Sequence, residues 1–179
     1  MYAKNSWKKY QEQDQGVEDV FAFNELYKDF ITKGKTERAC VKEALSLAKQ
    51  AGFKSLDEYD QLKTGDKVYV VNKEKNIALF VIGERPLEEG LRILGAHIDS
   101  PRLDLKQNPL YESEGFALAD THYYGGIKKY QWVTIPLSLY GVVVKKDGEV
   151  VDIVIGEDEN DPVVGISDLL IHLSADQLD

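Results

Sequence analysis

The sequence predicts an α/β fold in which helices are followed by short strands. Two observations support this prediction. Over the first fifty residues, apolar side chains recur every three or four positions, the spacing that places them on one side of a helix. Beyond Gly65, apolar and polar residues alternate instead, as in a strand with one buried face. Helices followed by such strands are typical of an α/β domain with a mixed sheet.

Two helices are expected in the N-terminal region. The first covers the segment from Trp7 to Gly34, because a glycine is a favourable residue just past a helix end. The second covers residues 35–50, with Thr36 as its cap and Gly52 beyond its end. Its buried side is expected to consist of small and apolar residues, namely Ala39, Cys40, Ala44, Leu47 and Ala48.

Three strands are expected between Gly65 and residue 100. Residues 67–72 and 77–82 flank a polar stretch, which indicates a hairpin or a pair of strands. Residues 91–97 (LRILGAH) form a short apolar run after a charged loop. Such a run is the pattern of a buried strand.

A boundary is expected near Ser100–Pro101, where the composition changes. Residues 133–144 and 150–155 are rich in β-branched side chains and predict strands, and the Asp-Gly pair between them favours a hairpin turn. Residues 1–100 and 101–179 are therefore expected to form separate domains, the second rich in strands. Residues 166–173 (ISDLLIHL) are apolar enough to need a partner surface, so the sequence is expected to be part of a longer one.

Charge and composition exclude several classes of protein. The chain carries 31 acidic and 22 basic residues, for a net charge of -9. This argues against binding to nucleic acid or to an anionic membrane, because both require clustered Lys and Arg. Apolar runs stay well short of the ~18 residues of a membrane span, and no signal peptide is recognisable, so a cytoplasmic protein is expected. The single cysteine, Cys40, excludes an internal disulfide and a cysteine-rich zinc site.

The most informative motif is GAHIDSP at residues 95–101. If this segment is a strand, His97 and Asp99 project to the same side. A neutral imidazole is a good zinc ligand, and a carboxylate commonly holds its other ring nitrogen. The alternative is a hydrogen-bonded histidine with a structural role. A serine hydrolase centred on Ser100 is disfavoured, because the chain contains no G-x-S-x-G motif.

Other polar groups have simpler explanations. His172 lies in an apolar stretch, where a histidine at a core or an interface is the plain alternative to a catalytic one. His122 precedes a Tyr-Tyr-Gly-Gly sequence and is either a substrate contact or a structural loop residue. The acidic run at residues 157–161 (EDEND) lacks the spacing of a calcium loop and predicts a solvated loop.

Long stretches of the chain resemble the M18 (aspartyl aminopeptidase) family. GAHIDSPRLDLKQNPLYE, at residues 95–112, is similar to the family segment that carries the first zinc-binding histidine. THYYGGIKKYQWVTIPLSLYGVVVKKDG, at residues 121–148, is similar to the sequence that follows it in bacterial members. The resemblance covers essentially the whole chain. It implies that residues 1–100 are the N-terminal part of a zinc-peptidase α/β catalytic domain, and that residues 101–179 are part of a β-rich dimerisation domain.

The resemblance also implies an activity and roles for three residues. The activity is a metal-dependent aminopeptidase that uses a two-zinc site and acts on peptides as a homo-oligomer. His97 matches a zinc ligand, and Asp99 matches an aspartate that orients a ligand and tunes its basicity. His172 matches a histidine that the dimerisation domain offers to the active site of a neighbouring subunit.

The family's remaining zinc ligands and its general base have no counterpart in these 179 residues. The chain alone is therefore expected to be inactive and to bind zinc weakly, because catalytic zinc usually takes three protein ligands. The rival hypothesis belongs to another class of protein. It is a free-standing, non-catalytic binding or interaction module that retained the fold.

Overall fold

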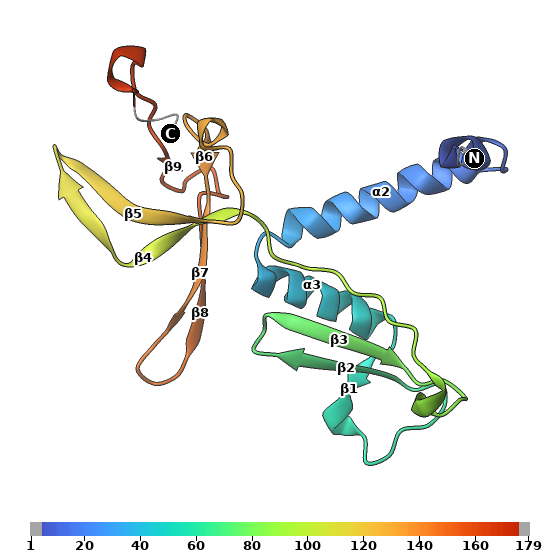
Figure 1. Cartoon of the computed structure of the whole chain (residues 1–179). Coiled ribbons are helices and arrows are strands. Elements are labelled where there is room, and N and C mark those ends of the chain that lie inside the picture. Colours follow the sequence, from blue (N-terminus) through green and yellow to red (C-terminus); the bar gives the residue numbers. More distant parts are fainter. Residues whose placement is uncertain (1–4, 176–179) are drawn as a thin grey trace. The chain divides into compact units, whose positions relative to one another are not determined.

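A computed structural model describes residues 5–175 (Figure 1). The chain divides into two compact units that meet between Ser100 and Pro101. The first contains helices and a mixed sheet, and the second consists mainly of antiparallel strand pairs. The fold is therefore a mixture of α and β structure, as predicted. The outer ends of the two predicted domains, residues 1–4 and 176–179, lie outside the described residues.

The first unit begins with two helices where the sequence predicted one. Helix α1 covers Ser6–Gln11 and helix α2 covers Gly16–Lys33. The chain turns between them because Gln15 has a left-handed backbone, with φ 57°. The following glycine is needed there, since a Cβ on it would collide with the carbonyl of Tyr10. The predicted end at Gly34 is confirmed, and its N–H donates to the Phe30 carbonyl at 2.8 Å.

Helix α3 covers Glu37–Gln50 and supplies most of the core of the first unit. Thr36 caps it as predicted, because its Oγ1 accepts a hydrogen bond from the Ala39 N–H at 3.2 Å. Cys40 and Ala48 are buried as predicted, whereas Leu47 is 47% exposed and was wrongly placed on the buried side. The buried hydrophobic residues among the described residues are Cys40, Val41, Ala48 and Val68.

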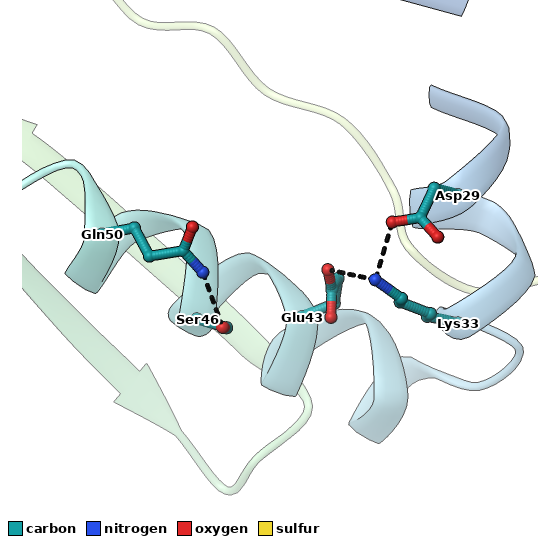
Figure 2. Close-up of polar contacts among 5 residues, drawn as sticks. All are labelled: Asp29, Lys33, Glu43, Ser46 and Gln50. Atoms are coloured by element: carbon teal, nitrogen blue, oxygen red, sulfur yellow. Dashed lines mark hydrogen bonds and ion pairs between the residues drawn. The ribbon is translucent and has the colours of Figure 1, made fainter. Parts of the chain in front are cut away.

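A polar contact joins α2 to α3 (Figure 2). The Lys33 ammonium, in the last turn of α2, lies 2.6 Å from the Asp29 carboxylate and 3.6 Å from the Glu43 carboxylate of α3. The hydrogen bond to Asp29 raises the pKa of Lys33 above its ordinary value, with further contributions from the charges of Asp29 and Glu43. Because all three side chains contact solvent, we expect this contact to contribute little to the stability of the fold.

The sheet of the first unit has three strands in the order β1-β2-β3. Strand β1 (Lys54–Ser55) runs parallel to β2 (Lys67–Asn72), which pairs antiparallel with β3 (Asn76–Val81). The predicted hairpin is therefore confirmed. Its turn places Lys73 and Glu74 at positive φ, 49° and 56°, as a tight hairpin turn requires. Helix α3 packs against β3.

The strand expected at residues 91–97 does not form. Residues 91–101 have no regular secondary structure, and the side chains of Ile93 and Leu94 are 80% and 102% exposed. A strand needs a neighbour whose backbone completes its hydrogen bonds. No strand of the described residues pairs with this segment, so its apolar composition alone does not make it a strand.

The second unit opens with a long hairpin. Strand β4 (Arg102–Ser113) pairs antiparallel with β5 (Phe116–Tyr124), and the turn places Glu114 and Gly115 at φ 52° and 78°. The register shifts between Leu105 and Leu110, where β4 bulges. At this bulge the Lys106 ammonium lies 2.9 Å from the Asp120 carboxylate.

Two further strand pairs complete the second unit. Strand β7 (Leu139–Val144) pairs with β8 (Val150–Ile155), and β6 (Pro136–Leu137) pairs with β9 (Val164–Gly165). The predicted Asp-Gly hairpin is confirmed, with Gly148 at φ 88°. The strand predicted for residues 133–144 forms only in part, because Thr134 has φ 62° and breaks the extended run.

Candidate functional site

His97 and Asp99 contact each other in the irregular segment that precedes β4. The His97 Nδ1 lies 3.0 Å from the backbone carbonyl of Asp99 and 3.0 Å from its Oδ1. The two side chains were expected to meet because they alternate along a strand. That reason is wrong, since the segment is not a strand, and the two side chains meet within an irregular stretch instead.

The contact selects one form of the imidazole. When Nδ1 donates its hydrogen to the two Asp99 oxygens, the neutral ring presents the lone pair of Nε2. The His97 side chain is 84% exposed, so this nitrogen is accessible to an incoming ligand or metal ion. The Asp99 side chain is less exposed, at 39%. A carboxylate on the far nitrogen is the arrangement found behind metal-binding histidines.

The described residues fit a zinc ion only in part. One imidazole with a carboxylate behind it is a suitable ligand, and its chemistry matches zinc. Within residues 5–175, however, no group of three or more His, Cys, Asp or Glu side chains could hold a metal ion. The described residues therefore offer one imidazole with the chemistry of a ligand and no complete metal site.

The other two histidines lie elsewhere in the chain. His172 lies in a short 3₁₀ turn, Ile171–Leu173, in the second unit. It is exposed, and so are its neighbours Leu170 and Ile171, at 75% and 83%. His122 lies on β5 opposite Asp104, with its Nδ1 3.4 Å from the Tyr123 carbonyl. His97 belongs to the first unit and His172 to the second, so neither unit alone contains both.

A polar cluster at the start of β4 was not expected from the sequence. The Arg102 guanidinium lies over the Tyr124 ring, 4.0 Å from its centroid. Its Nε donates to the Asp104 Oδ1 at 2.7 Å, and its Nη2 lies 3.4 Å from Oδ2. Arg and Asp two apart in a strand are a visible pattern in the sequence. The tyrosine was not predictable, because only the register places Tyr124 opposite Arg102.

The acidic loop is held by its own carboxylates. The Asp161 Oδ2 accepts from the Gly156 and Asp158 N–H groups, at 2.7 and 3.2 Å. Hydrogen bonds from the Asn160 backbone and side chain lower the pKa of Asp158. These carboxylate oxygens accept hydrogen bonds from the backbone of the same loop, as expected for a solvated loop. The sequence also lacks the spacing of a calcium-binding loop.

Comparison with known proteins decides the family. The family model described as aminopeptidase I zinc metalloprotease (M18) matches residues 30–178. The chain belongs to the M18 aminopeptidase family. The match spans His97, Asp99 and His172, and it confirms the resemblance inferred from the sequence.

Individual M18 proteins support this assignment. The chain is 53% identical over 180 residues to a probable M18 family aminopeptidase 1 of Clostridium acetobutylicum, covering 98% of this chain and 38% of the relative. The crystal structure of aminopeptidase I from Borrelia burgdorferi B31 matches with a TM-score of 0.86 and 44% identity, over 94% of this chain and 41% of that one. This M18 chain thus spans less than half the length of these relatives.

A solved structure with lower sequence identity is that of an oligomer. The mApe1 dodecamer of S. cerevisiae matches with a TM-score of 0.65 and 25% identity, over 79% of this chain and 34% of that one. Within the described part of the present M18 chain, no helix is long and apolar enough to cross a membrane.

Proposed function

We propose that this M18 chain supplies part of the active site of a metal-dependent aminopeptidase, which removes the N-terminal residue from peptides in the cytoplasm. The observation that carries the proposal is the His97–Asp99 contact, which lies inside the region matched by a zinc metalloprotease family. Residues 1–100 would form the N-terminal part of the catalytic domain. Residues 101–179 would form part of a β-rich dimerisation domain.

His97 would bind one of two zinc ions through Nε2, and Asp99 would hold the ring in the tautomer that exposes this nitrogen. Once bound, the two ions would acidify a water molecule and polarise the scissile carbonyl. Further ligands and a general base must come from outside the described residues, because those residues contain no group of three metal-binding side chains.

His172 would act on a neighbouring subunit in a homo-oligomer. Support comes from the exposed apolar residues on either side of it, Leu170, Ile171 and Leu173, which are 69–83% exposed. Contiguous exposed apolar residues mark an interaction surface. Support also comes from the S. cerevisiae relative, which forms a dodecamer. At such an interface, the imidazole would contact substrate held in the partner subunit's active site.

The 179-residue chain alone would be inactive and would bind zinc weakly. One imidazole supplies a small part of the free energy of binding that three or four ligands supply in a catalytic site. The chain would therefore act only together with the remaining ligands.

The test uses the complete enzyme that contains this sequence, and its metal content is measured by mass spectrometry. We expect His97→Ala to lose one zinc ion per active site and most of the peptidase activity, because the ion loses an inner ligand. His122→Ala is the matched control, since it removes an exposed imidazole on β5 and is expected to keep both properties. Full zinc content in His97→Ala would contradict the proposal, and the non-catalytic module would then be favoured.

A further inference from the structure

Strand β3 forms one edge of the sheet in the first unit (Figure 1). Among the described residues it pairs with β2 alone. In an antiparallel pair, residues that exchange hydrogen bonds with the partner alternate with residues whose backbone groups face away from it. The Ile82 N–H donates to the Asp66 carbonyl at 2.9 Å, which sets this alternation. The N–H groups of Ile77, Leu79 and Val81 therefore face away from β2, toward the edge of the sheet.

This edge lacks the features that keep exposed edges from pairing. In natural proteins those features are chiefly charged side chains, proline residues and bulges. Strand β3 (NIALFV) contains no charged residue and no proline, and its register with β2 is regular along its whole length. Its outward backbone groups are therefore suited to hydrogen bonds with a further strand.

The side chains of β3 also indicate an interior strand. The five residues 77–81 are all apolar, and such an uninterrupted run is typical of a strand that is buried on both faces. Here Leu79, Phe80 and Val81 are 46%, 48% and 63% exposed. Because successive side chains of a strand point to opposite faces, apolar surface contacts solvent on both faces of β3. The described residues thus cover neither its edge nor the whole of either face.

The same polypeptide can supply the neighbour that β3 requires. The chain spans 38% and 41% of the length of the Clostridium and Borrelia relatives, so more than half of each relative lies outside the match. A second copy of β3 could complete the hydrogen bonds, but it would bring an equally uncovered strand and leave the apolar faces in solvent. Residues 91–97, in the same unit, are irregular and supply no strand.

We infer that β3 is an interior strand of a larger sheet, and that its outer edge pairs with a strand of the complete enzyme from outside these 179 residues. The added strand is expected to be apolar, because a charged side chain beside Leu79 or Phe80 would be buried without a partner. The inference rests on the proposed function in one respect, since both place this chain in a longer polypeptide. It does not depend on zinc binding by His97.

The test compares two substitutions of Leu79 in the complete enzyme. Leu79→Ala removes the apolar side chain and keeps the backbone N–H, whereas Leu79→Pro removes the N–H as well. At an open edge this N–H donates to water and proline is tolerated, but inside a sheet proline removes a hydrogen bond between strands. We expect Leu79→Pro to melt at least about 5 °C below Leu79→Ala. Equal melting temperatures in the two variants would overturn the inference.

Hydrogen exchange of the wild-type enzyme carries the test if Leu79→Pro fails to fold. We expect the outward amides of Ile77 and Val81 to exchange within about tenfold of the rate of the Phe80 amide, which faces β2. Exchange of the outward amides at the rate of an unstructured chain would overturn the inference. Protection that disappears when the oligomer dissociates would overturn it too, because a second copy would then cover the edge.

The zinc content of His97→Ala separates this inference from the proposed function. If His97→Ala loses one zinc ion while the β3 edge exchanges freely, the interior strand is overturned and the proposed function stands. If His97→Ala keeps its zinc while the β3 edge is protected, the proposed role of His97 is overturned and the interior strand stands.

Discussion

At the scale of single residues, the candidate site depends on one local contact, between His97 and Asp99. The sequence predicts His97 and Asp99 as site residues because the two residue types at that spacing suit zinc chemistry, and their roles stay a prediction. It was not sufficient to give the geometry. The contact forms within an irregular segment, whereas the prediction assumed a strand. The contact between the two side chains is therefore present, on a backbone that the alternation of residue types did not predict.

The Arg102 cluster, in contrast, joins residues that lie far apart in the sequence. Nothing in the local sequence connects Arg102 with Tyr124, which lies 22 positions away. Their contact follows from the register of β4 and β5, and that register includes a bulge between Leu105 and Leu110. A bulge changes which residues face each other, so the pairing could not be inferred from counting positions alone.

A residue-scale prediction concerns Tyr140 on β7. Burial, followed by a hydrogen bond to Glu157, raises the pKa of Tyr140 from 10.0 to about 12. The folded state therefore keeps this proton more firmly than the unfolded state. The resulting stabilisation is fully present below pH 10 and is lost as the pH rises from 10 toward 12, since the unfolded chain loses its proton first.

Tyr140→Phe should remove this contribution. We expect urea midpoints of the wild type to fall more steeply between pH 9.5 and about 11.5 than those of Tyr140→Phe, because only the wild type has this titrating group. Tyr130→Phe, at a side chain that is 61% exposed, is the control and should follow the wild type. Parallel curves for Tyr140→Phe and the wild type would contradict the assignment.

At the scale of elements, local turn and cap chemistry was the most predictable part of the fold. The cap at Thr36, the end of α2 at Gly34 and the hairpin turn at Gly148 all follow from interactions within a few residues. The break between α1 and α2 was missed, because it depends on a left-handed Gln15, which is not a residue type typical of that conformation. The missing strand at residues 91–97 depends on a neighbour that the pattern does not specify.

The cap leads to a prediction for helix α3. Thr36→Ala removes the oxygen that accepts from the Ala39 N–H and leaves a helix-end donor without its side-chain partner. We expect a loss of about 1 kcal/mol in the free energy of unfolding. Urea denaturation followed by circular dichroism measures it. Thr36→Ser keeps the hydroxyl and should cost much less, so an equal loss in the two variants would show that the methyl group and not the cap matters.

At the scale of the whole molecule, the amount of apolar surface is the main feature. A domain of about 150 residues normally buries some 70% of the surface that its unfolded chain exposes. Among the described residues, four hydrophobic side chains are buried, and all belong to the first unit. The sequence has the apolar content of a globular protein, at 43%. The described residues therefore bury few of the apolar side chains that the composition supplies.

This mismatch predicts how the 179-residue chain behaves when it is produced alone. Ile93 and Leu94 are 80% and 102% exposed in a segment without a strand partner, and Ile171 is 83% exposed near His172. Apolar, unpaired segments associate with one another. We expect the isolated chain to aggregate at micromolar concentration in light scattering coupled to size exclusion.

The double variant Ile93→Lys/Leu94→Lys should reduce this aggregation, because it adds charge where no described side chain packs, and it should leave the helical circular dichroism unchanged. Val41→Lys is the contrasting control, since Val41 is 2% exposed and a charge there should disrupt helix packing. A compact monomer with a cooperative unfolding transition would instead show that the exposed apolar residues of the unmodified chain need no other segment or subunit to cover them. The free-standing module then explains the sequence better than the enzyme segment does.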